Sequence, residues 1–348
     1  MLRLLTRSGK APLTRIVPSE KIAQQARTRL IDGALPPAIL PALRREAAVA
    51  RARRGGVSTW WTSSEQLSAA AGAPASASAT ECALAMLLHH ASGGDLEVSR
   101  RVVGAEWWVQ HRSLSAPKGF HFDVDQEQQR RGGALRSPAL SSILYLTDAG
   151  GPTLILDQVA TICSWSGHVL LSPPEPAEAD VIHPLANRFV LFRAACLHGC
   201  LPPLGAGCGV EGAEAAEQPK RTTLLVNWWI GERPAPPSCA EAPPSLLDEM
   251  RRASAPHYAE ALAAGGGAWK WDEAVARPLD VSDVGTGEAC QQVCLEVPLP
   301  AGEGPNGRAQ AANTPVDLLL PLAGLDSGSG VRVTGMGRVR LQRAMMDS

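Results

Sequence analysis

Two side chains that commonly bind metals stand two positions apart in the segment GFHFD (119–123). Residues i and i+2 of a β-strand project from the same face. An extended backbone here would therefore direct His121 and Asp123 toward one ion. A site with two histidines and one carboxylate suits ferrous iron, because it leaves coordination positions open for other reactants. A His-x-Asp pair is weak as an isolated motif, so this prediction depends on a third ligand.

The best candidate for the third ligand is His198. It follows the apolar run 189–192 and precedes Gly199. This pattern predicts a buried strand followed by a turn, which would bring His198 to the mouth of a barrel. His183 is the alternative, although Pro184 beside it favours a loop.

An anion could bind near that metal through Arg221 and Thr223. These residues open the apolar run 224–229 and share one face of the expected strand, whereas Lys220 would face the other way. A guanidinium offers a planar fork of donors to a carboxylate, and a neighbouring hydroxyl adds another donor. Tyr145 could supply a phenolic donor from a second strand. Core packing is the alternative role for this tyrosine.

Composition restricts the classes of partner. The 33 Lys and Arg residues balance 34 Asp and Glu residues, so we expect no nucleic acid partner. No run approaches the roughly eighteen apolar residues of a membrane span. We expect a cytoplasmic protein, with weak organelle targeting by the basic residues 1–15 as the alternative. The eight cysteines lack the close pairs of a zinc ribbon, which favours reduced thiols.

The elements that must position these residues change character along the chain. Helical spacing is expected at 19–30, 37–47 and 81–90, with an Ala/Ser/Gly-rich linker at 68–80. From about residue 104, short apolar runs separated by Gly, Pro and Asp predict a β-sandwich or jelly roll. The expected strands are 106–111, 119–123, 141–146, 152–156, 168–172, 188–192 and 222–229.

Three regions follow from this pattern. They are a helical region (1–103), a mainly β core (104–232) and an irregular C-terminal extension (233–348) with short helices at 246–252 and 258–263. The small and acidic residues 205–220 predict a surface insertion within the core.

Other residues of this region receive structural interpretations. The pairs Trp107-Trp108 and Trp228-Trp229 are expected in the core, with outward members free to contact a substrate. Asp125 is expected in a solvated turn.

Taken together, four runs resemble the 2-oxoglutarate and Fe(II)-dependent dioxygenase superfamily, nearest its prolyl 4-hydroxylase-like branch. They are HFD (121–123), ILYLTDAGGPTLIL (143–156), NRFVLFRAACLHG (187–199) and RTTLLVNWW (221–229). The resemblance implies a double-stranded β-helix. It implies that His121, Asp123 and His198 hold iron, that Arg221 binds 2-oxoglutarate, and that Tyr145 contacts this co-substrate.

The sequence departs from the pattern of that branch in two ways. Arginine stands where prolyl hydroxylases usually have lysine, and the insertion 205–220 lengthens the interval between His198 and Arg221. Both departures bear on the substrate more than on the oxygenase chemistry.

The resemblance implies hydroxylation of a C–H bond by dioxygen, with release of succinate and carbon dioxide and with ascorbate as a candidate reductant. The substrate is open, since a peptidyl proline, a free amino acid, a small metabolite or a lipid-derived acid would fit. Two alternatives stand beside this hypothesis. One is a cupin-like metal-binding jelly-roll enzyme that does not use 2-oxoglutarate, and the other is a non-catalytic β-sandwich binding module.

Overall fold

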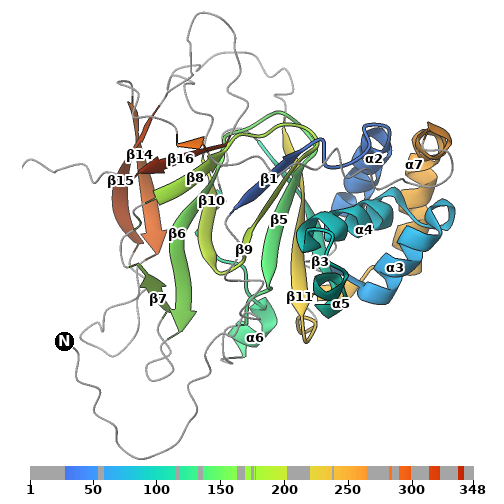
Figure 1. Ribbon diagram of the computed structural model, residues 1–348, viewed down its shortest axis with the longest axis horizontal. Helices are drawn as coiled ribbons and strands as arrows, with labels where there is room; N and C mark the ends of the chain where they lie inside the picture. Colours follow the sequence, from blue (N-terminus) through green and yellow to red (C-terminus); the bar gives the residue numbers. More distant parts are fainter. Residues whose placement is uncertain are drawn as a thin grey trace, which may run out of the picture.

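Two facing β-sheets form the centre of the molecule, and helices cover the outer face of one sheet (Figure 1). The computed structural model describes residues 28–53, 59–113, 118–131, 136–162, 169–173, 176, 178–201, 220–236 and 239–264, and the backbone of strands at 282–283, 290–298, 313–321 and 336–340. Two curled sheets with flanking helices constitute the jelly roll, or double-stranded β-helix. The fold class predicted from the sequence is therefore confirmed.

The first sheet is built mainly from antiparallel pairs. Its strand order is β1 (Arg29–Asp32), β9 (Arg188–Arg193), β5 (Leu140–Tyr145), β11 (Arg221–Ile230), β3 (Val102–Arg112), β2 (Thr59–Ser63) and β12 (Cys239–Glu241), the last pair being parallel. Strands far apart in the sequence thus become neighbours.

The second sheet has the order β13 (Ser282–Asp283), β16 (Met336–Arg340), β8 (Glu178–Ile182), β6 (Thr153–Ile162), β10 (Cys196–Cys200) and β4 (Lys118–His121). Strand β7 (Val169–Ser172) pairs with β6. Strands β14 (Cys290–Pro298) and β15 (Asn313–Pro321) form a separate antiparallel pair.

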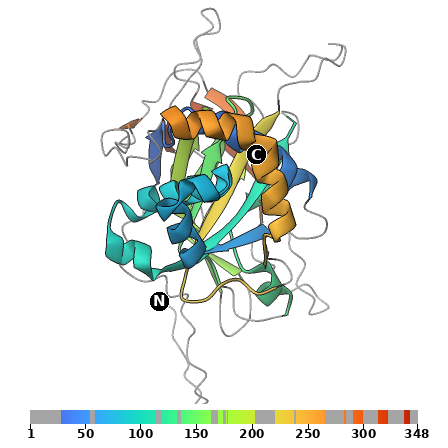
Figure 2. The same ribbon diagram turned by 90° about the vertical axis from the view of Figure 1, so that its right-hand side faces the viewer.

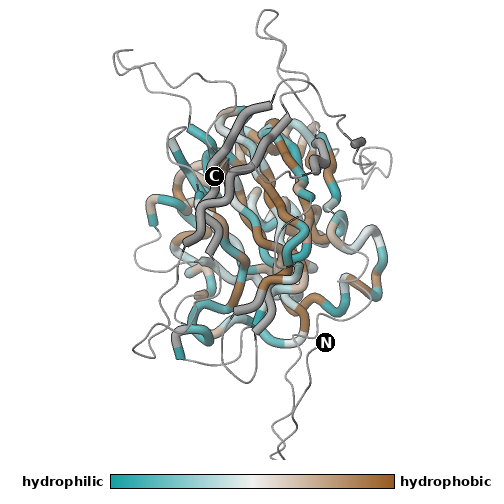
Figure 3. Tube along the Cα trace, turned by 90° about the vertical axis from the view of Figure 1, so that its left-hand side faces the viewer, coloured by the Kyte–Doolittle hydropathy of each residue, from teal (hydrophilic) through white to brown (hydrophobic). Residues whose placement is uncertain are grey.

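Both faces of the first sheet are covered in its middle, which explains why β11 is apolar from Leu224 to Ile230 except at Asn227. Leu224, Val226 and Trp228 belong to a core cluster shared with the helices. The alternate residues of β11 face the second sheet, where Tyr145 and Ile155 share another cluster. Figure 3 shows apolar segments in the interior of the molecule. Successive residues of a strand point to opposite faces. Trp228 and Trp229 are each 1% exposed, so both faces of β11 are covered at this point.

Helices α2 (Ile39–Ala52), α3 (Ser64–Gly72), α4 (Ala79–Ser92), α5 (Leu96–Arg101) and α7 (Pro244–Ala264) lie on one side of the molecule (Figure 2). Capping boxes begin α3 at Ser63 and α4 at Ser78. The linker predicted at 68–80 is therefore wrong, because α3, a short 3-10 turn (Pro74–Ser76) and the start of α4 occupy it.

Two further expectations are corrected by long-range packing. Leu30 was expected on a helix, yet it lies in β1 and pairs with Val190 of β9; residues 19–27 lie outside the described residues. The two short helices predicted after 233 are one helix, α7, which continues through Pro256 and packs against α2. The boundaries of the three predicted regions remain predictions, and most of the expected insertion, 202–219, lies outside the described residues.

Among the described helices, none combines the length and the apolar character that crossing a bilayer requires.

Candidate active site

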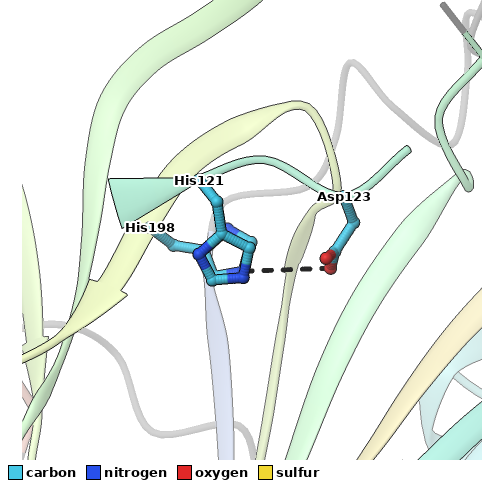
Figure 4. A group of neighbouring side chains, drawn as sticks. All are labelled: His121, Asp123 and His198. Atoms are coloured by element: carbon cyan, nitrogen blue, oxygen red, sulfur yellow. Dashed lines mark ion pairs between the residues drawn. The ribbon is translucent and has the colours of Figure 1, made fainter. Parts of the chain in front are cut away.

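A His-Asp-His cluster lies where β4 and β10 pair between the two sheets. His121 is the last residue of β4 and stands opposite His198 of β10 in the antiparallel register. The ligand atoms of His121, Asp123 and His198 all lie within 4.8 Å of one another (Figure 4). The structure therefore brings together the three residues that the sequence nominated as metal ligands.

Two local predictions about this cluster are corrected. The strand expected over 119–123 ends at His121, and Asp123 lies beyond it, held by a hydrogen bond from its N–H to the carbonyl of Ala194 (3.2 Å). His198 was expected in a turn, but it lies within β10, which pairs with both β4 and β6. His183, the alternative ligand, is not part of the cluster.

Backbone carbonyls fix the orientation of both imidazoles. Nδ1 of His121 donates to the carbonyl of Gly119 (2.9 Å), and Nδ1 of His198 donates to that of Cys196 (3.0 Å). Each Nε2 is then left with a lone pair, the usual arrangement around a metal-binding histidine. Burial, followed by the electrostatic interaction with the nearby imidazole of His198, lowers the pKa of His121 to about 4. The imidazole of His121 is thus neutral at physiological pH, which is the form that binds a metal.

The carboxylate of Asp123 is oriented by a chain of buried polar groups. The hydroxyl of Ser141 donates to Oδ2 of Asp123 (2.6 Å) and lies 2.8 Å from Oδ1 of Asn227. The amide of Asn227 in turn donates to Glu106 (3.4 Å). Burial raises the pKa of Glu106, although hydrogen bonds from Thr59, Trp229 and Asn227 oppose this shift. These positions were not singled out in the sequence, because serine and asparagine inside a strand carry no spacing signal.

Arg221 lies in the same interior, at the other end of the site. Its side chain is 5% exposed, and its Nη2 donates to Thr153 Oγ1 (2.6 Å) and, at 3.4 Å, to the hydroxyl of Tyr145. Its Nη1 donates to Cys200 Sγ, while its Nε has no hydrogen-bond partner among the described residues. No acidic side chain in the described part of the chain forms an ion pair with it. A buried guanidinium with an unused donor fits an incoming carboxylate.

The surroundings of Arg221 also contain two other residues nominated from the sequence. Tyr145 is fully buried, hydrogen-bonds Thr153 (2.7 Å) and lies under the guanidinium, whose carbon is 5.2 Å from the ring centroid. Burial raises the pKa of Tyr145, with the charge of Arg221 opposing it, so the phenol stays protonated. Thr223 is 2% exposed and pairs across the sheet with Tyr145. Lys220, as expected, is exposed.

One cavity of about 950 Å³ joins the His-Asp-His cluster to Arg221. Its lining includes both histidines, Asp123, Arg221 and Thr223, and Trp108 borders it as a half-buried side chain. Trp108 is the outward member of its tryptophan pair, as the sequence suggested. Trp107 packs on the helix side and is 1% exposed.

Asp125 behaves differently from expectation. It is 2% exposed rather than solvated, and its carboxylate accepts from Arg136 (2.9 Å), the N–H of Gln128 (3.1 Å) and the N–H of Ala235 (2.9 Å). It caps the short helix α6 (Gln126–Arg130) and ties the loop after Asp123 to the chain that follows β11. An acidic residue directly before a Gln-rich turn was a capping signal in the sequence.

No family model matches the sequence, and no curated protein matches it either. Solved structures are nevertheless similar. A prolyl-4-hydroxylase from Pseudomonas putida is 17% identical with a TM-score of 0.36, covering 65% of this chain and 99% of that one. The epimerase SnoN of nogalamycin biosynthesis, solved with Fe3+ and alpha ketoglutarate, is 12% identical with a TM-score of 0.35, covering 66% and 95%. HygX from Streptomyces hygroscopicus, solved with nickel and 2-oxoglutarate, is 12% identical with a TM-score of 0.30, covering 60% and 84%.

These are enzymes of the class that the sequence resembles.

Proposed function

We propose that this chain is an Fe(II)- and 2-oxoglutarate-dependent dioxygenase that hydroxylates a C–H bond and releases succinate and carbon dioxide. The observation that carries the proposal is the presence of two complementary sites in one cavity. The His-Asp-His cluster offers the donor set of a ferrous centre, and Arg221 offers a buried cation that forms no ion pair with the acids of the described ranges.

The residues fit both groups chemically. His121 and His198 direct their Nδ1 atoms to backbone carbonyls and their Nε2 atoms remain for a metal, and Asp123 presents a carboxylate, so three protein ligands leave positions open on the metal. The distal carboxylate of 2-oxoglutarate would be held by Arg221, with Thr223 and Tyr145 as neighbouring hydroxyl groups. When bound, iron with 2-oxoglutarate and dioxygen supplies the oxidising power that no amino acid side chain has.

The chain's own residues perform the remaining tasks. The carbonyls of Gly119 and Cys196 orient the two imidazoles and, in the neutral rings, place the lone pair on Nε2, and Ser141 fixes the rotation of the Asp123 carboxylate. Ile143 and Phe192, members of a buried apolar cluster, line part of the cavity and lower its polarity there. Charges within such a site interact more strongly than they do in water. We propose ascorbate as the reductant and an unidentified organic or peptidyl molecule as the substrate.

The test is an anaerobic titration of the purified protein with Fe(II) and then 2-oxoglutarate, followed by the weak visible charge-transfer absorption of the chelate. We expect this band in the wild type, its loss with His121→Ala, and a need for much higher 2-oxoglutarate with Arg221→Gln. Lys220→Gln is the matched control, because this neighbour is exposed. Iron binding without the band would favour the cupin-like alternative. Absence of iron binding would favour the non-catalytic binding module.

A further inference from the structure

Glu106 is a buried acid in the wall of the cavity, and two polar side chains connect it to Asp123. It belongs to β3 and is 8% exposed. Its partners are hydrogen-bond donors, namely Thr59 (2.7 Å), Trp229 (2.9 Å) and Asn227 (3.4 Å). Within the described part of the chain, no basic side chain forms an ion pair with it. A buried carboxylate without a counter-ion commonly takes up a proton, because burying the bare charge is costly.

The hydroxyl of Ser141 sets the direction of the hydrogen bonds that lead from Glu106 to Asp123. Its Oγ lies 2.6 Å from Oδ2 of Asp123 and 2.8 Å from Oδ1 of Asn227. A hydroxyl has one proton, whereas an ionised carboxylate has only acceptors. Asp123 must be ionised to bind a metal, so the proton of Ser141 points to it. The oxygen of Ser141 then has to accept a hydrogen bond from Asn227, which only the amide nitrogen can donate.

Asn227 meets this requirement if its amide group makes half a rotation. The rotation exchanges the amide oxygen and nitrogen at nearly the same positions. Among the described residues, Ser141 and Glu106 are the only hydrogen-bond partners of this side chain, so no third contact fixes its orientation. After the rotation, Oδ1 of Asn227 faces Oε2 of Glu106 at close to the present 3.4 Å. Two acceptor oxygens repel each other there, and a proton on Oε2 makes the contact a hydrogen bond.

We propose that Glu106 is a positioning residue held in its protonated form, from which hydrogen bonds run in one direction through Asn227 and Ser141 to Asp123. The Oε2–H of Glu106 donates to Asn227, the amide N–H of Asn227 donates to Ser141, and the Ser141 O–H donates to Asp123. Each of the two middle groups thus accepts one hydrogen bond and donates one. The inference rests on the proposed function, because metal binding makes Asp123 the final acceptor.

The other contacts of Glu106 are compatible with a proton on Oε2. Oε1 still accepts from Thr59, and the protonated oxygen keeps a lone pair for the indole N–H of Trp229. Burial raises the pKa of Glu106, and the charge of Asp123 acts in the same direction, against the hydrogen bonds that lower it. A neutral Glu106 therefore fixes the rotation of the Asp123 carboxylate without adding a second negative charge to this part of the cavity.

The first experiment records infrared spectra of the full-length protein, with and without Fe(II), for the wild type and Glu106→Gln. A protonated carboxylic acid has a C=O stretching band of its own, separate from the bands of carboxylates. We expect this band in the wild type and its loss in Glu106→Gln. Glu97→Gln is the control and should keep the band, because Glu97 is exposed and pairs with Arg100. Loss of carboxylate bands in Glu106→Gln, with no change in the carboxylic acid region, would show an ionised Glu106 and overturn the proposal.

The second experiment measures the Fe(II) dissociation constant by anaerobic calorimetry. Glutamine is neutral and its amide can donate to Asn227, so Glu106→Gln should bind Fe(II) as the wild type does. Glu106→Ala and Asn227→Ala should each raise the dissociation constant by about tenfold or more, the usual effect of removing an outer partner of a metal ligand. Equal weakening by Glu106→Gln and Glu106→Ala would overturn the proposal, as would unchanged affinity in Asn227→Ala.

The two experiments remain decisive if one part fails. If an alanine variant does not fold, the comparison of the wild type with Glu106→Gln still tests whether the charge of Glu106 contributes to metal binding. The infrared spectrum of the metal-free protein needs neither iron nor 2-oxoglutarate. It therefore decides the protonation of Glu106 even if iron does not bind and the proposed function fails.

Discussion

Replacing Ser141 by alanine should weaken metal binding without touching a metal ligand. The Ser141 hydroxyl donates to Oδ2 of Asp123 over 2.6 Å, and the Asp123 side chain is only 13% exposed, so solvent screens this bond little. A hydrogen bond to a charged group contributes about 1.5–3 kcal/mol. Loss of an outer partner of a metal ligand typically costs about 10–100-fold in affinity, which corresponds to about 1.4–2.7 kcal/mol. The two ranges overlap, so we expect the Fe(II) dissociation constant to rise by roughly one to two orders of magnitude.

The neighbouring serine provides a matched control. Ser142 is equally buried at 2% exposed, but it points to the helix side, where its hydroxyl donates to the carbonyl of Val226 (2.9 Å) and accepts from Trp228 (3.1 Å). Ser142→Ala should lower the free energy of unfolding by about 1 kcal/mol and leave metal affinity unchanged. Anaerobic calorimetric titration with Fe(II) measures the affinity, and urea unfolding measures the stability. Equal metal affinities in Ser141→Ala and wild type, or equal weakening by both variants, would refute the role given to Ser141.

Other predictions follow from the same structure. Gly150 has φ +109°, and a Cβ there would lie 2.8 Å from carbons of Arg221. Gly150→Ala should therefore displace Arg221 and raise the KM for 2-oxoglutarate by about tenfold or more. Gly231 has φ +87° in open space, so Gly231→Ala should lower stability and leave this KM unchanged. Burial raises the pKa of Cys82 to about 11. Iodoacetamide at pH 8 should therefore label Cys82 on the order of a hundredfold more slowly than an ordinary thiol. Peptide mass spectrometry measures this rate, and rapid labelling of the folded protein would contradict the prediction. Burial lowers the pKa of His90 below 6.5. The unfolded state therefore binds more protons, and stability should fall as the pH drops below about 6.5. In His90→Gln, the free energy of unfolding in urea should depend less on pH between pH 7.5 and 5.5, and the same pH dependence as the wild type would contradict this role of His90.

Several features were predictable because they depend on neighbours in the sequence. The alternating and apolar runs from residue 104 onward predicted the β-core, and the structure contains strands at each of those runs. Arg221 and Thr223 share a face because strand periodicity requires it, and the same rule leaves Lys220 exposed. The sequence also contains a signal for the start of α4, since Ser78 followed three positions later by Glu81 is a capping box.

Other features depend on partners far along the chain. Leu30 has helical spacing with its predecessors, yet pairing with Val190 in the sheet overrides that preference. Asp125 resembles a surface acid until Arg136 and the N–H of Ala235 bury it. Trp228 is buried because it joins the core cluster shared with the helices, whereas Trp229 is buried against Trp61 of β2 and Cys239 of β12, which come from distant parts of the sequence.

The sequence by itself determined which residue types could hold a metal and an anion, and the local strand that presents Arg221. The tertiary structure decided that these groups share one cavity, because the register of β4 against β10 brings His198 opposite His121. It also placed Arg112 opposite Arg221 and Ser141 against Asp123. Local propensity specifies backbone conformation within a few residues, whereas strand register is set by the burial of whole faces across the sheet. Contacts across strands therefore follow only from the folded arrangement.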